Sequence, residues 1–328
     1  MVPDGLWSIG ELAHRAGVTV KTVRHYSDRG LLPEAARSSG GHRRYGPDAL
    51  DRLRLIRSLR GLDLPVTAID RILNRQDAAG EVTGDAAGEA PGRALGDALE
   101  DAVATQLKEL GSRLAALRWR EAALRLLHDC PAEERADRLR LIGAVGSPPD
   151  TAALARYWRR VLPPRLPTRQ VARIVDAAVP QPPADPSPAQ VLAFARLHAL
   201  TTMPCPGGVD APPRPPADGG TYRPAVLYDG LAEAYDLAVP ALRAGRAPRA
   251  GEALDCFVAA HAAAHGDRDT PAFRRLLGHR LDALAHPVMD RYWQLAADLT
   301  DADTPTLGAA HDWLRAALDS QAGPADRA

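Results

Sequence analysis

A short basic segment near the N-terminus carries side chains suited to hydrogen bonding with a polyanion. Lys21, Arg24 and His25 recur at the spacing of one helical face, opposite Val20 and Val23. Thr19, Thr22 and Asp28 add polar groups at the edges of that face. A short helix with one buried and one basic side suits the base edges and phosphates of the DNA major groove.

A second basic segment follows at residues 37–45, where a glycine turn separates basic flanks that are compatible with β-strands. Arg43 and Arg44 near this turn are placed to reach phosphates or a minor groove, as in a β-wing. A solvated surface explains a single arginine equally well. However, residues 1–76 hold thirteen Lys and Arg against eight Asp and Glu, whereas the whole chain is balanced at 41 and 41. The excess positive charge is therefore concentrated where the candidate DNA-reading residues lie.

The elements that would position these residues have clear start and stop signals. Ser8 and Glu11 form a potential capping box, and Gly17 ends the helix that follows. Thr19 is placed to cap a second helix that runs to about Asp28, ahead of Gly30. Two short helices joined by a tight turn predict a helix-turn-helix. Further helices are predicted over 47–60 and 66–73.

Several short motifs make the interpretation more specific. Ile9-Gly10-Glu11-Leu12-Ala13, Lys21-Thr22-Val23-Arg24-His25-Tyr26, Gly30-Leu31-Leu32-Pro33 and Gly41-His42-Arg43-Arg44-Tyr45 resemble the N-terminal signature of the MerR family over residues 8–75. His25, His42 and Asp63 depart from the residues usual in that family, Asp63 standing at a usual glycine position.

The resemblance implies a winged helix-turn-helix that contacts DNA through its second helix and its wing. Arg24 and Tyr26 would act from the helix, and Arg43, Arg44 and Tyr45 from the wing. The complete set expected at the interface is Thr19, Lys21, Thr22, Arg24, His25, Tyr26, Arg37, His42, Arg43, Arg44 and Tyr45.

Behind this domain (1–76), residues 77–96 are rich in Gly, Ala and acidic residues and predict a linker. Residues 97–130 then alternate steps of four and three between apolar positions, which is typical of a coiled-coil seam. The resemblance implies an antiparallel coiled coil that joins two copies of the chain. The seam residues are Val103, Leu107, Leu110, Leu114, Leu117 and Leu124, with Glu121 as a polar interruption.

Residues 131–328 predict an all-helical domain, so that the whole fold is expected to be mainly α. Ser187-Pro188, Thr270-Pro271 and Thr304-Pro305 each predict a helix start. Helices are expected near 150–162, 168–179, 187–201, 224–244, 251–265, 271–285, 287–299 and 305–320, with loops at 163–167, 180–188 and 204–220.

Aromatic side chains in this domain either fill its core or line a site for an organic effector. The candidates for such a site are Tyr157, Trp158, Phe194, Tyr228, Tyr235, Phe257 and Trp293. A ligand-free or protein-sensing domain is the alternative.

Metal and cofactor chemistry has little support in the sequence. Cys130, Cys205 and Cys256 are far apart, which disfavours both a disulfide framework and a thiolate metal site. His261 and His265 have a helical zinc-ligand spacing, but a histidine beside Gly266 also suits a helix C-terminus. No cobalamin motif, phosphate loop or nucleophile elbow is found. We expect neither a cofactor nor catalysis.

The sequence thus predicts a cytoplasmic, dimeric, ligand-responsive transcription regulator, without a membrane segment or a signal peptide. By the resemblance, it would bind promoter DNA, distort the promoter spacer for RNA polymerase and respond to a small organic effector. The alternative is an effector-independent architectural DNA-binding protein or a repressor. The sequence leaves open whether it activates or represses, the operator sequence and the effector.

Overall fold

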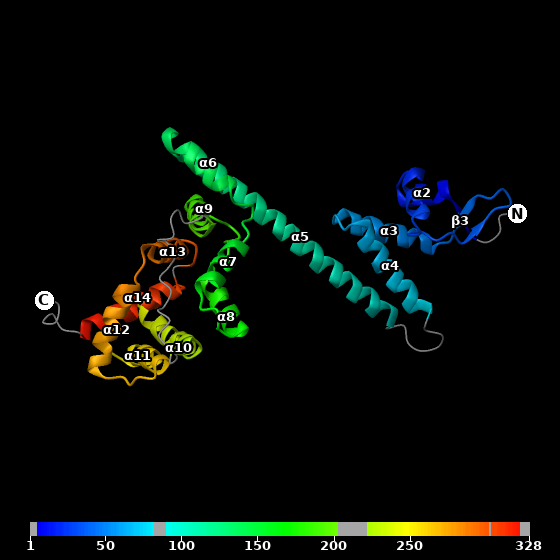
Figure 1. The fold of residues 1–328 in the computed structure, drawn as a ribbon. Helices are drawn as coiled ribbons and strands as arrows, with labels where there is room; N and C mark the ends of the chain where they lie inside the picture. Colours follow the sequence, from blue (N-terminus) through cyan, green and yellow to red (C-terminus); the bar gives the residue numbers. More distant parts are fainter. Residues whose placement is uncertain (1–4, 82–89, 203–221, 302, 322–328) are drawn as a thin grey trace. The chain divides into compact units, whose positions relative to one another are not determined.

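A computed structural model describes residues 5–81, 90–202, 222–301 and 303–321 and divides the chain into two units, 1–113 and 114–328. Fourteen α-helices and one short sheet lie within the described residues, so the mainly α architecture is confirmed (Figure 1). Over these same ranges, no helix is both long enough and apolar enough to cross a membrane. Cys205, the loop predicted at 204–220 and the centre of the predicted linker lie outside them.

The first unit combines helices with a small antiparallel sheet in the order β1-β3-β2. Trp7 pairs with Tyr45, and Arg37 pairs with Arg43. The elements are β1 (Trp7–Ser8), α1 (Ile9–Ala16), α2 (Val20–Asp28), β2 (Ala36–Arg37), β3 (Arg43–Tyr45), α3 (Asp48–Gly61) and α4 (Val66–Glu81), followed by the start of α5 (Ala90–Asp129). Strands β2 and β3 form the predicted wing, whereas β1 was not predicted.

One apolar core holds the first unit together. Leu12 of α1, Val23 of α2 and Leu53 of α3 are fully buried in it, together with Leu31 and Leu32 of the segment between α2 and the wing. Burying side chains of this size stabilises the fold by about 1.5–3 kcal/mol each. This core fixes α2 and the wing on a common scaffold.

The helices next to the predicted linker are longer than expected. Helix α4 continues to Glu81 instead of ending near Leu73, and α5 begins at Ala90 instead of 97. Alanine-rich and acid-rich stretches lack a strong hydrophobic period, but alanine has the highest helix propensity of all residues. The missing period predicted a linker here, whereas the alanine content favours helix.

The second unit contains the end of α5 and nine further helices. They are α6 (Arg135–Gly143), α7 (Ala152–Val161), α8 (Thr168–Ala178), α9 (Pro188–Thr202), α10 (Pro224–Arg243), α11 (Glu252–His265), α12 (Pro271–Leu284), α13 (Pro287–Ala297) and α14 (Leu307–Gln321), with a short 3₁₀ turn, η1 (Ala132–Glu134), before α6. Each of the eight helices predicted here is present, and α6 was not predicted.

Two apolar cores organise this unit. One gathers Trp119, Phe194 and Tyr292 between α5, α7, α9 and α13, and the other gathers Phe257 and Leu314 between α10, α11, α12 and α14. Trp119 Nε1 donates to the carbonyl of Pro183 at 3.0 Å, and Tyr292 Oη donates to the carbonyl of Ala178 at 2.8 Å. The buried polar tips of these aromatic residues are therefore hydrogen-bonded.

The caps of these helices follow local chemistry, with one correction. Thr270 Oγ1 accepts from the Phe273 backbone N–H at 3.1 Å, as expected for the start of α12. Helix α14, however, is capped by Thr306, whose Oγ1 accepts from Ala309 N, and not by Thr304. The Thr304 backbone N–H instead bonds to the Asp301 carbonyl within a turn, so the helix begins two residues later than its Thr-Pro signal.

Candidate nucleic-acid interface

The turn between α1 and α2 is built by the predicted capping residues. Ser8 N donates to Glu11 Oε2 at 2.6 Å, and Glu11 N donates to Ser8 Oγ at 3.3 Å, which completes the capping box. Hydrogen bonds to the Glu11 carboxyl from the Ser8 backbone first, and from the Ser8 side chain second, lower the pKa of this carboxyl. Gly17 ends α1 with a φ of 62°, a left-handed conformation that favours glycine. Both ends of α1 are therefore fixed by local interactions.

Thr19 begins α2 as its N-cap, since its Oγ1 accepts from Thr22 N at 3.1 Å. Val23 is the buried residue of this helix, while Val20 is 41% exposed. The expectation that Val20 points inward was therefore wrong. Val23 alone is fully buried on α2, and Val20, the first residue of the helix, lies outside this buried face.

The opposite side of α2 presents the predicted basic residues to solvent. Lys21, Arg24 and His25 are exposed, and Tyr26 is half-buried with its ring against that of His25. Within the described chain, Lys21 and Arg24 form no ion pair or side-chain hydrogen bond. Their charges are thus available to an external anion.

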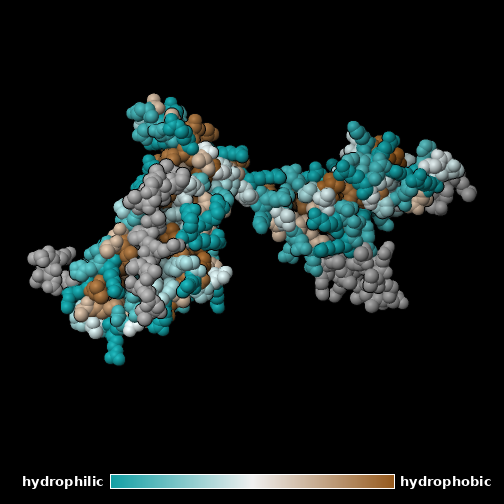
Figure 2. Space-filling model, in the orientation of Figure 1, coloured by the Kyte–Doolittle hydropathy of each residue, from teal (hydrophilic) through white to brown (hydrophobic). Residues whose placement is uncertain are grey.

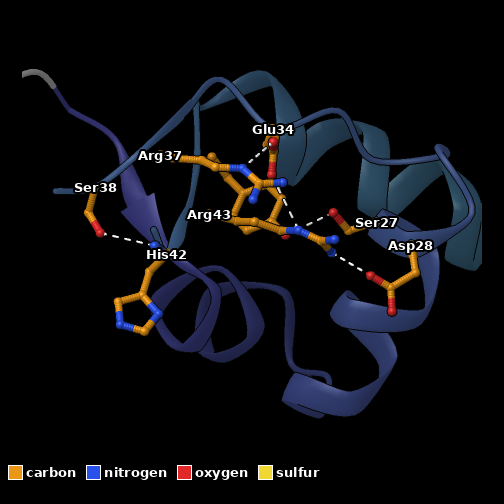
Figure 3. Close-up of polar contacts among 8 residues, drawn as sticks. Ser27, Asp28, Glu34, Arg37, Ser38, His42 and Arg43 are labelled. Carbon is orange, nitrogen blue, oxygen red and sulfur yellow. Dashed lines mark hydrogen bonds and ion pairs between the residues drawn. The ribbon is translucent and has the colours of Figure 1, made fainter. Parts of the chain in front are cut away.

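The wing is tied to the end of α2 through Arg43. Arg43 Nη1 donates to Asp28 Oδ1 at 2.5 Å, and Arg43 Nε lies 3.3 Å from Glu34 Oε2 (Figure 3). Arg37 Nε donates to the other oxygen of Glu34 at 2.8 Å. The hydrogen bond with Asp28 raises the pKa of Arg43. Arg43 therefore serves first to join the wing to the helix.

The wing's aromatic residue lies inside the unit. Tyr45 is fully buried, and its Oη donates to Ser27 Oγ of α2 at 3.0 Å. We accordingly leave the Tyr45 side chain out of the DNA-contacting set proposed below. Side chains alternate between the two faces of a strand, so the inward position of Tyr45 on β3 places Arg44 on the opposite face. Arg44, next to Tyr45, is half-buried, and its side chain has no hydrogen-bond or ion-pair partner among the described residues.

The turn of the wing is closed by Ser38 and Gly41. Ser38 N donates to the carbonyl of His42 at 2.8 Å, and His42 N donates to Ser38 Oγ at 3.1 Å (Figure 3). Gly41 has a φ of 77°, which a side chain would strain. His42 and Arg37 remain exposed on this turn.

Other arginines of the first unit stabilise its scaffold. Arg57 Nη1 donates to the Ala16 carbonyl at 2.5 Å, and Arg52 Nε donates to the Leu31 carbonyl at 2.7 Å while its guanidinium pairs with Asp77. Arg29 at the end of α2 is exposed and lacks such a partner within the part of the chain described. Sequence analysis did not include Arg29, although its position directly after the basic helix could have indicated it. The visible face of this unit is mostly hydrophilic (Figure 2).

The predicted coiled-coil seam lies on the exposed side of α5. Leu107, Leu110, Leu114, Leu117 and Leu124 are between 46% and 67% exposed, and Val103 is half-buried. Leucines at this spacing rarely stay in water along a whole helix face. The exposed row is therefore available to a partner.

The candidate metal residues are held by other contacts. His261 packs edge-on against the Phe257 ring at 4.8 Å between centroids, and His265 lies 5.1 Å from the Tyr222 ring. Among the residues that the structure describes, no group of three or more His, Cys, Asp or Glu is placed to hold a metal ion.

The candidate effector residues separate into two groups. Trp158, Tyr228, Tyr235 and Trp293 line a cavity of about 640 Å³ in the second unit. Tyr157, Phe194 and Phe257 are instead buried in the two apolar cores. His261 and His265, the candidate metal pair, also line this cavity. The charged residues of its wall were not predicted, because they come from several helices and form no local motif.

Comparison with known proteins finds a family and several relatives that resemble part of this chain. Residues 7–76 match the family described as MerR HTH family regulatory protein. The chain is 44% identical over 68 residues to the nodulation protein NolA of Bradyrhizobium sp. (strain NC92), and 46% identical over 68 residues to the HTH-type transcriptional activator TipA of Streptomyces coelicolor. It is also 41% identical over 71 residues to an HTH-type transcriptional regulator ZntR homolog of Haemophilus influenzae.

The family match lies in the N-terminal part of the chain, and the three relatives match over segments of similar length. They cover 21%, 21% and 22% of this chain, and 29%, 27% and 53% of the three relatives. No solved structure matches the chain. The second unit therefore has to be interpreted from its own residues.

Proposed function

We propose that residues 7–76, a MerR-family helix-turn-helix domain, bind double-stranded promoter DNA and make this protein a transcription regulator. The observation that carries the proposal is the face of α2, where Lys21 and Arg24 are exposed and unpaired beside a wing that Arg43 joins to the helix. Arg24 is best placed to read bases, while Lys21, Arg37 and Arg44 neutralise phosphates and His42 hydrogen-bonds to the DNA backbone. Thr19, Thr22, His25 and Tyr26 complete the helix surface.

The second element of the proposal is a homodimer formed through α5. The exposed leucine row supplies an apolar strip with steps of three and four residues. A dimer would present two copies of α2, and a palindromic operator would then match the symmetry of the protein. The antiparallel pairing of α5 remains an expectation from the family resemblance.

The third element is a response to an organic effector bound in the second unit. An effector changes the equilibrium between two dimer states only if it binds one of them better. In the distortion mechanism, the favoured state bends and untwists the promoter spacer, so that RNA polymerase can engage both promoter elements. Bending a site of 20–30 bp costs about 1–6 kcal/mol, which a differential binding energy of ordinary size can supply.

The test is a structure of the dimer on the promoter of its own operon, with and without small molecules that copurify with the protein. We expect a bent or untwisted spacer in at least one state and only a modest change in operator affinity on effector binding. Straight DNA in both states would exclude distortion but keep DNA binding. A loss of affinity of tenfold or more, about 1.4 kcal/mol, would instead indicate a repressor that dissociates.

A further inference from the structure

The cavity in the second unit is a partly open hollow lined by seven neighbouring helices. Its walls come from α7, α8, α10, α11, α12, α13 and α14, which run from green to red in Figure 1. Its volume of about 640 Å³ falls in the range of sites that hold drug-sized molecules. Every residue of its lining belongs to the second unit.

Aromatic rings held in fixed positions form one wall. The rings of Trp158 and Trp293 lie 5.3 Å apart. Trp293 packs directly on the backbone of α14 at Gly308, where a Cβ would stand 2.1 Å from the indole Cγ. Tyr228 and Tyr235 of α10 extend the aromatic lining. Rigid ring faces of this kind favour a flat aromatic ligand.

Two buried histidines in the lining are neutral. Tyr235 Oη lies 3.1 Å from His311 Nδ1, and both His261 and His311 contact the Phe257 ring. Burial lowers the pKa of His261 to about 3 and that of His311 to about 4. His261 Nε2 is buried without a hydrogen-bond partner. These imidazoles therefore contribute polarity to the cavity but no positive charge at neutral pH.

The charged residues of the lining leave an excess of carboxylates. Arg173 pairs with Asp229 at 2.8 Å and Arg315 with Asp282 at 2.6 Å, and both of these aspartates stand outside the lining. Arg280 is the remaining cation. Three lining aspartates have no ion pair within the described residues, namely Asp236, Asp290 and Asp312.

Two of these carboxylates act on each other. Burial raises the pKa of the Asp312 carboxyl, and the nearby Asp290 raises it further. Asp290 comes from α13 and Asp312 from α14, so the fold brings together two like charges. Arg315 opposes this effect on Asp312, but its guanidinium is paired with Asp282. Like charges held in a partly buried site are relieved by a bound cation. An anionic ligand would meet the unpaired carboxylates of Asp236, Asp290 and Asp312, whereas Arg280 is the one lining arginine without an ion pair in the described residues.

We propose that this cavity binds a flat, drug-sized organic cation, whose rings lie against Trp158, Trp293 and the tyrosines while its charge faces Asp290 and Asp312. The inference rests on the proposed function in one respect, that this ligand is the effector. Attraction between a cation and an aromatic face adds to that of the carboxylates. A neutral ligand would bury the carboxylates without compensating their charge.

A series with one ring system and three charges tests the proposal. Calorimetric titration of the DNA-free full chain at pH 8 compares N-methylacridinium, acridine and acridine-9-carboxylate, which are cationic, neutral and anionic. We expect one site per chain, with N-methylacridinium bound about tenfold more tightly than acridine and the carboxylate bound most weakly. Equal affinities, a reversed order or no binding of any acridine would overturn the proposal.

Variants then assign the preference to the carboxylates. Asp290→Asn with Asp312→Asn should abolish the advantage of the cation over acridine, whereas Asp298→Asn, at the exposed end of α13 and outside the lining, should leave it unchanged. Trp293→Leu should weaken both ligands together and preserve their order. If the Asn double variant kept the full preference, the charge assignment would be wrong.

A transcription assay separates this inference from the proposed function. Each acridine is added to promoter DNA with either the wild-type chain or the Asn double variant, so that direct effects of the dye on DNA cancel. Cation-selective binding with identical transcription from both proteins would refute an effector role and leave the cavity assignment intact. Regulation by another ligand, without acridine binding, would refute the cavity assignment and support the regulator.

Discussion

The wing arginine Arg43 donates to the carboxylate of Asp28, the last residue of α2, across a distance of 2.5 Å. The two residues are fifteen positions apart and join the wing to α2, beside the hydrogen bond from Tyr45 to Ser27. Because Glu34 also contacts Arg43, the positive charge of Arg43 is largely balanced within the protein. The neighbouring Arg44 has no such partner in the described chain, so the two adjacent arginines have different roles.

This difference predicts distinct salt dependences for the two wing variants. Arg44→Ala should reduce the slope of log K against log salt by about 0.9, because one phosphate contact is lost. Arg43→Ala should change the slope less, since the charge of Arg43 is already paired. Asp28→Asn should likewise loosen the attachment of the wing to α2, because it removes the same ion pair. Fluorescence anisotropy with operator DNA between low and moderate salt measures the slopes. Equal slope changes for Arg43→Ala and Arg44→Ala would show that Arg43 leaves Asp28 to bind phosphate.

Base reading is expected from α2. Arg24→Ala should weaken operator binding by about 1–3 kcal/mol and relax sequence preference at one position. Arg54→Ala is the matched control, because Arg54 is exposed on α3 and pairs with Asp51. Competition between operator and random DNA gives the specificity ratio. If Arg24→Ala left this ratio unchanged, Arg24 would be a phosphate contact and not a base reader.

The exposed leucine row on α5 predicts the oligomeric state. Leu110→Asp together with Leu117→Asp should convert a dimer into a monomer with weak operator affinity, because two charges would enter an apolar seam. Leu139→Asp is the control, since Leu139 is 56% exposed on α6 and lies off the seam. Analytical ultracentrifugation resolves the species. A double variant that still sediments as a dimer would place the interface elsewhere.

Local interactions were the part of this structure that could be predicted from the sequence. The Ser8–Glu11 box, the Gly17 terminus and the Thr19 cap each depend on residues within a few positions, and all three were confirmed. Thr304 failed as a cap because Thr306, equally capable, stands two residues later. Hydrophobic periodicity likewise located the helices of the second unit.

Long-range pairing could not be predicted in the same way. Nothing in the sequence near Arg43 indicates that Asp28 neutralises it, or that Tyr45 turns inward to Ser27. The cavity shows the same limit, because Asp290 and Asp312 are isolated aspartates on different helices. Aromatic type alone did not separate Trp158 and Trp293, which line the cavity, from Phe194, which fills the core.

Asp63 predicts a gain in stability on substitution by glycine. Its φ of 60° is the only positive value among the non-glycine residues that the structure describes, and left-handed backbone costs an L-residue about 1–2 kcal/mol, less for Asp than for most. Asp63→Gly should therefore raise the unfolding free energy of the first unit by about 0.5–1 kcal/mol. Asp63→Ala should lower it, since alanine tolerates the left-handed region less well than aspartate. Urea denaturation followed by the fluorescence of Trp7 distinguishes the two, and a destabilised glycine variant would contradict this account.

Acid should destabilise the second unit through its neutral histidines. Burial lowers the pKa of His261 to about 3 and of His311 to about 4, whereas an unfolded chain titrates near 6.5. Between these values the unfolded state binds protons that the folded state does not, so the unfolding free energy falls as the pH falls. From pH 7 to pH 5 the loss is about 2 kcal/mol for each histidine. Asp312 opposes it, because its raised pKa favours protonation in the folded state.

The histidine assignment is tested by the pH dependence of unfolding. His261→Leu should remove about half of the loss between pH 7 and pH 5, measured by urea denaturation with tryptophan fluorescence. His279→Leu, at an exposed position of α12, should retain all of it. Direct titration of the imidazole resonances in a histidine-labelled chain provides the independent measurement, with His261 and His311 unchanged down to pH 5. If either imidazole titrated near pH 6.5, it would be accessible to water. The cavity lining at His261 or His311 would then carry positive charge in mild acid.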